Sequence, residues 1–169
     1  EGTTAQSNFT VQVSRSWTKS VLYYSKWQKV AVDAAKNAYV SGLNGNSYMI
    51  DAHRFDSNGV ETSSLSYALP SSTGATDIAT TSTGDKVYIA TTASGRGAVI
   101  WFNCAAGFCT GAGSFNPVMG TPESSIYSIA TDTTGVYISG NEKVYSCGRY
   151  SCSYVTQGFV QKMDLNMNF

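Results

Sequence analysis

Few side chains in this sequence have the types and spacing that enzyme chemistry requires. The single histidine, His53, lies in a predicted strand, and no G-x-S-x-G segment accompanies it to support a Ser-His-Asp arrangement. Glycoside hydrolysis needs a matched pair of carboxylates, and no pattern selects one. The candidates are Glu61, Asp77, Glu123 and Glu142. Since a Walker loop and a dinucleotide fingerprint are also missing from the sequence, we expect no catalytic residues, no cofactor and no enzyme activity.

A metal site could be built from Asp51 and Asp56, which lie close to Asn58 in the sequence. However, the dipeptide Asn58-Gly59 is the strongest short signal for a hairpin turn, and a turn accounts for the same residues. We therefore expect a turn at this position and no metal.

The four cysteines form two C-x4-C pairs, Cys104/Cys109 and Cys147/Cys152, each flanked by strand-like sequence. Facing residues of an antiparallel strand pair lie about 4.5–5.5 Å apart at Cα, within the range that a disulfide accepts. We favour two hairpin disulfides. Free buried thiols, crossed pairing and a four-thiolate zinc site remain as alternatives, although these loops carry no His or Asp that could help to bind zinc.

The cysteines and one sequon point to the same compartment. Disulfides indicate an oxidising environment, and Asn8-Phe9-Thr10 is an acceptor triplet for N-glycosylation. The chain opens with Glu1 rather than Met, so we expect a processed or trimmed product from which any signal peptide is already gone. Together these features predict a secreted or cell-surface glycoprotein, with Asn8 as the glycan site.

Composition and charge exclude several classes of protein. The 169 residues include 11 basic and 11 acidic side chains without a run of like charge, which argues against nucleic-acid binding and a polybasic membrane patch. Apolar runs such as residues 98–102 are far shorter than the roughly 20 residues that cross a bilayer, so no membrane insertion is expected. Charged residues make up only 13% of the chain, and the abundance of Thr, Tyr and Val favours strands over helices.

One pattern occurs three times along the chain. Each copy has an apolar pair, a short polar turn, and a tyrosine flanked by β-branched residues. The copies are residues 30–42, 78–90 and 129–140. Their anchoring alanines recur at about 50-residue intervals, which is the length of one four-stranded blade; they are Ala31, Ala79 and Ala130. A short acceptor side chain begins each turn; these residues are Asp33, Thr81 and Asp132.

This unit resembles the β-propeller repeats of bacterial and other surface proteins, which read A-V-D-x-x-G-N-x-Y-V-x-G and overlap with the NHL and YVTN types. Residues 30–42 match them most closely. The resemblance implies an all-β single domain over residues 1–169, a β-propeller of four-stranded antiparallel blades, with about three full blades plus terminal strands. A propeller has roughly four to eight blades. The ring would therefore be closed by the terminal segments of this chain, by another chain, or by sequence that has been cut away.

The remaining strands can be placed within this scheme. Third and fourth strands are expected at residues 47–55 and 60–69, 98–104 and 109–115, and 143–147 and 152–156. Both cysteine pairs would then lie at the turn between strands three and four. The repeated tyrosines would fill the space between blades; these are Tyr39, Tyr88 and Tyr137. The tryptophans are expected in the core; these are Trp17, Trp27 and Trp101.

The loops between second and third strands are the expected ligand sites. Their polar side chains can hydrogen-bond sugar hydroxyls or a peptide backbone, although the loops lack the aromatic platform that lectin sites normally add. The candidates are Asn44, Asn46, Arg96 and Asn141. We expect a non-catalytic binding protein for carbohydrate or a protein partner. The alternative is a structural subunit of a cell-surface or filamentous assembly, either a homo-oligomer or a chain whose partner completes the propeller, docking through open strand edges.

Overall fold

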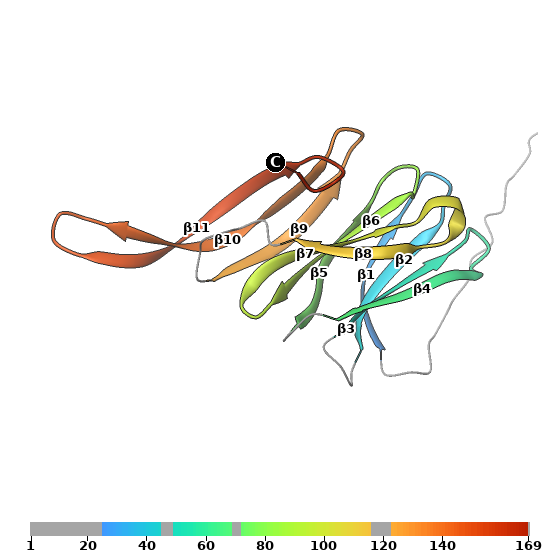
Figure 1. The fold of residues 1–169 in the computed structure, drawn as a ribbon, viewed down its shortest axis with the longest axis horizontal. Coiled ribbons are helices and arrows are strands. Elements are labelled where there is room, and N and C mark those ends of the chain that lie inside the picture. Colours follow the sequence, from blue (N-terminus) through green and yellow to red (C-terminus); the bar gives the residue numbers. More distant parts are fainter. Residues whose placement is uncertain (1–24, 45–48, 69–71, 116–122, 169) are drawn as a thin grey trace, which may run out of the picture.

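The computed structural model describes residues 25–44, 49–68, 72–115 and 123–168, which form three antiparallel sheets (Figure 1). Sheet 1 contains β1 (Ser25–Val32), β2 (Ala38–Asn44), β3 (Met49–Phe55) and β4 (Glu61–Ala68). Sheet 2 contains β5 (Ser72–Thr80), β6 (Lys86–Ala93), β7 (Arg96–Asn103) and β8 (Thr110–Phe115), with a 3-10 turn η1 (Ala105–Gly107) before β8. Sheet 3 contains β9 (Ser124–Thr131), β10 (Val136–Cys147) and β11 (Cys152–Met163).

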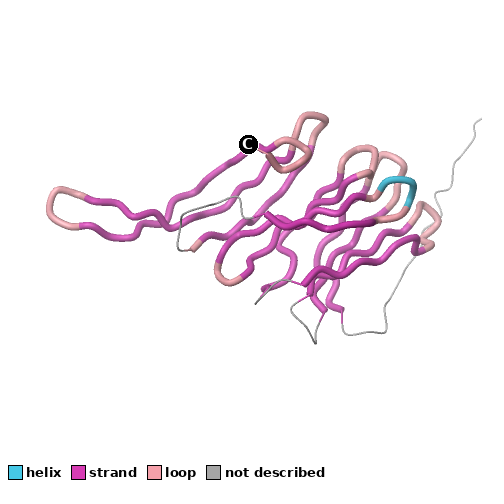
Figure 2. Tube along the Cα trace, viewed as in Figure 1, coloured by secondary structure: helices cyan, strands magenta, loops and turns pink. Residues whose placement is uncertain are grey.

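The all-β prediction is confirmed, and each sequence repeat forms the first hairpin of a sheet. These hairpins are β1–β2, β5–β6 and β9–β10, and within each sheet consecutive strands are neighbours (Figure 2). The described residues form three separate sheets and no closed propeller. The glycosylation candidate Asn8, Trp17 and the expected strands before residue 25 lie outside the described residues.

The predicted turn residues accept hydrogen bonds at the start of the three repeat hairpins. Asp33 Oδ1 accepts from the backbone N–H of Asn37 at 2.9 Å. Asp132 Oδ1 accepts from the N–H of Gly135 at 2.9 Å, and Thr81 Oγ1 accepts from the N–H of Lys86 at 3.2 Å. These side chains fix the turns by binding nearby backbone donors, as short acceptor side chains do.

A closely similar turn follows the third strand in sheets 1 and 3. In the turn of residues 56–60, Asp56 Oδ1 accepts from the N–H groups of Asn58 and Val60 at 2.9 and 2.8 Å. In the turn of residues 164–168, the corresponding donors to Asp164 Oδ1 are two asparagine N–H groups at 2.7 and 2.9 Å. The fourth residue of each turn has a positive φ, +78° in the first and +67° in the second, as three-residue hairpin loops require. The hairpin predicted from Asn58-Gly59 is therefore confirmed.

Sheet 3 differs from the predicted four-stranded blade. The expected loop at Gly140-Asn141 lies inside β10, which pairs with β11 without interruption from Val136↔Met163 to Cys147↔Cys152. The segments predicted as a second and a third strand are thus one strand, because continuous pairing with β11 satisfies the backbone through the polar Gly-Asn dipeptide. Among the described residues this sheet has three strands, and its long β10–β11 hairpin projects beyond the other two sheets (Figure 1).

Both predicted disulfides are present. Cys104 pairs with Cys109 and Cys147 with Cys152, at Cα–Cα distances of 3.7 and 4.0 Å. The expectation that they occupy equivalent places is wrong. The first closes the β7–β8 connection, between the third and fourth strands of sheet 2, whereas the second closes the β10–β11 hairpin, between the second and third strands of sheet 3.

The core lies on both sides of sheet 2. Ile100 and Phe102 face sheet 1, while Val99 and Trp101, which alternate with them along β7, face sheet 3. Successive residues of a strand point to opposite faces, so burial of both faces accounts for the uninterrupted apolar run of residues 98–102. The tyrosines of the second strands behave as predicted in the first two sheets, where Tyr39 and Tyr88 are buried between sheets.

Candidate functional site

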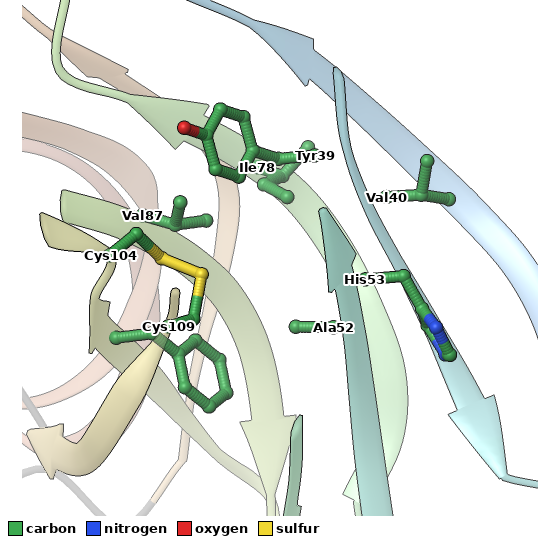
Figure 3. Close-up of a pocket in the computed structure, with 9 residues that line it drawn as sticks. Tyr39, Val40, Ala52, His53, Ile78, Val87, Cys104 and Cys109 are labelled. Carbon is green, nitrogen blue, oxygen red and sulfur yellow. A yellow bond between two sulfur atoms is a disulfide. The ribbon is translucent and has the colours of Figure 1, made fainter. Parts of the chain in front are cut away.

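The cavity between sheets 1 and 2 is a packing gap. Tyr39, Ile78, Val87 and the Cys104–Cys109 disulfide converge on it, whereas His53 points away from them (Figure 3). Its volume of about 10 Å³ is at the lower limit for a single water molecule, and its exposed lining is apolar. This cavity offers no room for a ligand.

The second cavity lies where the β6–β7 turn meets β9 and β10, and its volume is about 330 Å³. We refer to it as the sheet 3 groove. Apart from Tyr127, the lining residues are polar or small, and they come from sheets 2 and 3. The residues are Thr92, Gly95, Glu123, Ser124, Ser125, Tyr127, Asn141, Glu142, Lys143 and Thr156.

A β-bulge exposes the aromatic ring. The β9–β10 register runs from Ser128↔Ser139 to Ile126↔Gly140, so Tyr127 is an extra residue with no partner in the ladder. A bulge of this kind re-aims a side chain, and the Tyr127 side chain is accordingly 58% exposed. Gly140 permits the close strand packing here, because a Cβ at this position would run into the Ser125 carbonyl oxygen.

Three polar side chains of β10 line the groove together with Tyr127. The Asn141 side-chain amide donates to the Tyr127 hydroxyl at 2.7 Å, which orients both groups. Glu142 Oε1 accepts from the side-chain amide of Gln157 at 2.9 Å. Lys143 Nζ lies 2.6 Å from Glu123 Oε2, in an ion pair whose side chains are 41% and 59% exposed. The groove therefore presents carboxylate and amide oxygens as acceptors and amide and ammonium groups as donors.

The backbone of sheet 2 closes one side of the groove. The N–H of Ser124 donates to the Gly95 carbonyl at 3.1 Å, and Ser124 Oγ accepts from the N–H of Gly97 at 2.9 Å. The turn itself has a positive φ at both central residues, +50° at Ser94 and +74° at Gly95, as tight hairpin turns of this length do. The turn is thus held against β9 by two hydrogen bonds.

The structure brings only part of the predicted ligand set together. Asn141 lines the sheet 3 groove, and the turn directly before Arg96 forms part of its wall. Arg96 itself is exposed at the start of β7. Asn44 ends β2 in sheet 1, and Asn46 lies outside the described residues. Tyr127 was not among the predicted ligand residues, and the signal for it in the sequence is the irregular spacing of apolar residues around Ile126 and Ile129.

The remaining candidates for chemistry are placed as follows. His53 Nδ1 lies 2.8 Å from Glu61 Oε1 on the neighbouring strand. Asp77 Oδ2 accepts from Ser128 Oγ and the N–H of Ile129, both at 2.9 Å, and so joins sheet 2 to sheet 3. Within the described ranges no three His, Cys, Asp or Glu side chains come close enough to hold a metal ion. Nor does this part of the chain contain a helix long and apolar enough to span a membrane.

Comparison of the sequence with protein-family models and with curated proteins, and of the fold with solved structures, gave no match.

Proposed function

We propose that this protein is a non-catalytic, extracellular binding protein that recognises carbohydrate in the sheet 3 groove. The observation that carries the proposal is the exposed Tyr127 ring, held by Asn141 beside the carboxylates of Glu123 and Glu142. A tyrosine combines an apolar ring face with a polar tip. The C–H face of a pyranose can lie on the ring while its hydroxyls bond to the amide and carboxylate groups.

The size and the chemistry of the groove support a short saccharide. A volume of about 330 Å³ lies at the lower end of the usual range for small-molecule sites. The Glu123–Lys143 pair is partly exposed, and exposed pairs contribute only about 0–1 kcal/mol. A sugar hydroxyl can therefore take the place of one partner at little cost. Two disulfides agree with an extracellular setting.

The architecture that we propose for this binding protein is a segment of a β-propeller, with each sheet as one blade. The support is the sequential packing of the first strands, because β1 lies against β5 and β5 lies against β9. The residue pattern of the repeats and the four-stranded meanders of sheets 1 and 2 agree with this assignment. The resemblance to NHL and YVTN-type blades is part of the same proposal.

A glycan array followed by calorimetry tests the proposed function. Tyr127→Ala is expected to abolish binding of the glycans that the wild type retains, and Asn141→Ala is expected to weaken it. Tyr145→Ala is the matched control, because Tyr145 is similarly exposed (64%) but lies outside the groove. A wild type that binds no glycan, or a Tyr127→Ala variant that binds as the wild type does, would refute the proposal.

A further inference from the structure

Each of the first two sheets presents a tyrosine to the next sheet along the chain. The Tyr39 hydroxyl donates to the carbonyl oxygen of Gly84 at 2.9 Å, and the Tyr88 hydroxyl donates to that of Leu165 at 2.7 Å. Both acceptors lie in turns of the following sheet, Gly84 between β5 and β6 and Leu165 after β11. A tyrosine-to-turn hydrogen bond is therefore a repeated feature of sheet packing in this protein.

A carboxylate and a cation accompany the tyrosine in sheet 1. The Tyr39 hydroxyl lies 3.1 Å from Asp33 Oδ2, and Arg54 Cζ lies 5.8 Å from the centre of the Tyr39 ring. Arg54 Nη1 also donates to the carbonyl oxygen of Gly107 in sheet 2 at 3.1 Å. This carboxylate–tyrosine–cation cluster thus donates two hydrogen bonds to the backbone of the next sheet.

The same cluster recurs in sheet 3, on the face turned away from sheet 2. The Tyr137 hydroxyl donates to Asp132 Oδ2 at 2.9 Å, and Lys162 Nζ lies 5.1 Å from the centre of the Tyr137 ring. Asp132, Lys162 and the neighbouring Ala130 are exposed. We refer to Tyr137, Asp132, Lys162 and Ala130 as the outer face of sheet 3. No further sheet packs on it within the described ranges, although its chemistry matches a face that elsewhere binds a sheet.

The opposite end of the stack is exposed along β1. Val30 and Val32 are 64% and 56% exposed. Ile78 and Ile129, which take the place of Val30 in the registers of sheets 2 and 3, are 6% and 5% exposed because the preceding sheet covers them. Other residues of this face of sheet 1 form a buried cluster of their own. The described exposed residues therefore lie in the second half of β1, and adjacent sheets contact one another through their first strands.

We propose that the outer face of sheet 3 binds the β1 side of sheet 1 in a second copy of this chain. The two ends of the stack are complementary halves of the interface that already joins sheet 1 to sheet 2 and sheet 2 to sheet 3. Sheet 1 of the second copy supplies the turn of residues 56–60. This turn has the same internal hydrogen bonds as the turn of residues 164–168, to which Tyr88 donates. On binding, the Tyr137 hydroxyl turns from Asp132 to donate to one carbonyl of this turn, and the Lys162 ammonium donates to another. Because the contact is heterologous, it builds a ring if the rotation closes and a filament if it does not.

Directed cross-linking tests the pairing of the two ends. Ala79 and Ile129 pack in one cluster between sheets 2 and 3, so Ala130 of one copy is expected opposite Val30 of the next. Equal amounts of Ala130→Cys and Val30→Cys protein, distinguished by a mass tag, are mixed under mild oxidation. We expect the mixed dimer to exceed the share that random collision gives. Dimers of Ala130→Cys with itself, or no enrichment, would overturn the proposal.

Solution mass provides a second measurement that needs no cysteine. The wild type is expected to sediment as multiples of 18.0 kDa as concentration rises, without added sugar. Tyr137→Glu is expected to weaken association by about tenfold or more, as the loss of a central interface residue does. Tyr145→Glu, on the projecting hairpin, is the matched control and should associate as the wild type does. A wild type that stays monomeric at all concentrations, or equal association of both variants, would refute the inference and leave carbohydrate binding untouched.

Discussion

The two disulfides close loops of the same length but are expected to contribute unequally to stability. Each joins cysteines five residues apart, and the chain-entropy relation gives about 2 kcal/mol for a loop of this size. Their surroundings differ. Cys104 is 3% exposed in the core between sheets 1 and 2, whereas Cys147 and Cys152 are exposed at the end of the β10–β11 hairpin.

These surroundings set the expected magnitudes. Replacing Cys104 and Cys109 with alanine removes the loop constraint and a buried sulfur worth about 1 kcal/mol, so the free energy of unfolding should fall by about 3 kcal/mol. Replacing Cys147 and Cys152 with alanine frees the unfolded chain by the same amount. The exposed end of the hairpin then frays in the native state as well, and this offsets most of the loss. We expect less than about 1 kcal/mol in that variant.

Urea unfolding followed by tryptophan fluorescence measures both variants, and hydrogen exchange locates the change. In the second variant, exchange should accelerate in residues 144–155 and stay unchanged in β6 and β7. Equal losses of stability in the two variants, or a larger loss in the second, would show that this reasoning from burial is wrong.

Three further predictions concern single side chains. Gly84→Ala should destabilise the protein by about 1–3 kcal/mol more than Gly95→Ala, as thermal unfolding of the two variants would show. Both glycines have a positive φ, but of the two only Gly84 is placed where an added Cβ would meet packed atoms. Tyr88→Phe should cost about 1 kcal/mol in urea unfolding, since it deletes a 2.7 Å hydrogen bond at a fully buried side chain; an unchanged midpoint would contradict this. Hydrogen bonds from Thr134 lower the pKa of Asp132 to about 2. The Asp132 carboxylate therefore contributes stability above about pH 4 that is lost as the pH falls through the folded pKa. An NMR titration of Asp132 with a midpoint near 4 would exclude this contribution.

Much of the fold could be predicted because the signals are local. The hairpin at Asp56-Ser57-Asn58-Gly59 follows from turn chemistry confined to four residues. The pairing of Cys104 with Cys109 follows from a short spacing within a hairpin, which leaves little choice of partner. The three repeat hairpins follow from the alternation of apolar residues and the acceptor side chain at each turn.

The predictions that failed depended on pairing between distant segments. The four-stranded blade scheme predicted a loop between second and third strands at Gly140-Asn141, yet β11 pairs across the dipeptide and keeps the strand extended. The strand register also decided where the second disulfide lies, at the second hairpin of its sheet rather than the third. Backbone hydrogen bonds to a neighbouring strand outweigh the preference of a dipeptide for turns.

The candidate site divides in the same way. The antiparallel strands, the turns of the three repeats and the turn of residues 56–60 follow from the sequence alone, as does the polar character of Asn141. Strand register and sheet packing placed Tyr127 in a bulge beside Asn141, closed the groove with the β6–β7 turn, and buried Tyr88 completely while leaving Tyr137 only partly buried. The physical reason is that alternation along a strand fixes which residues share a face, whereas the packing of whole sheets fixes which face is covered.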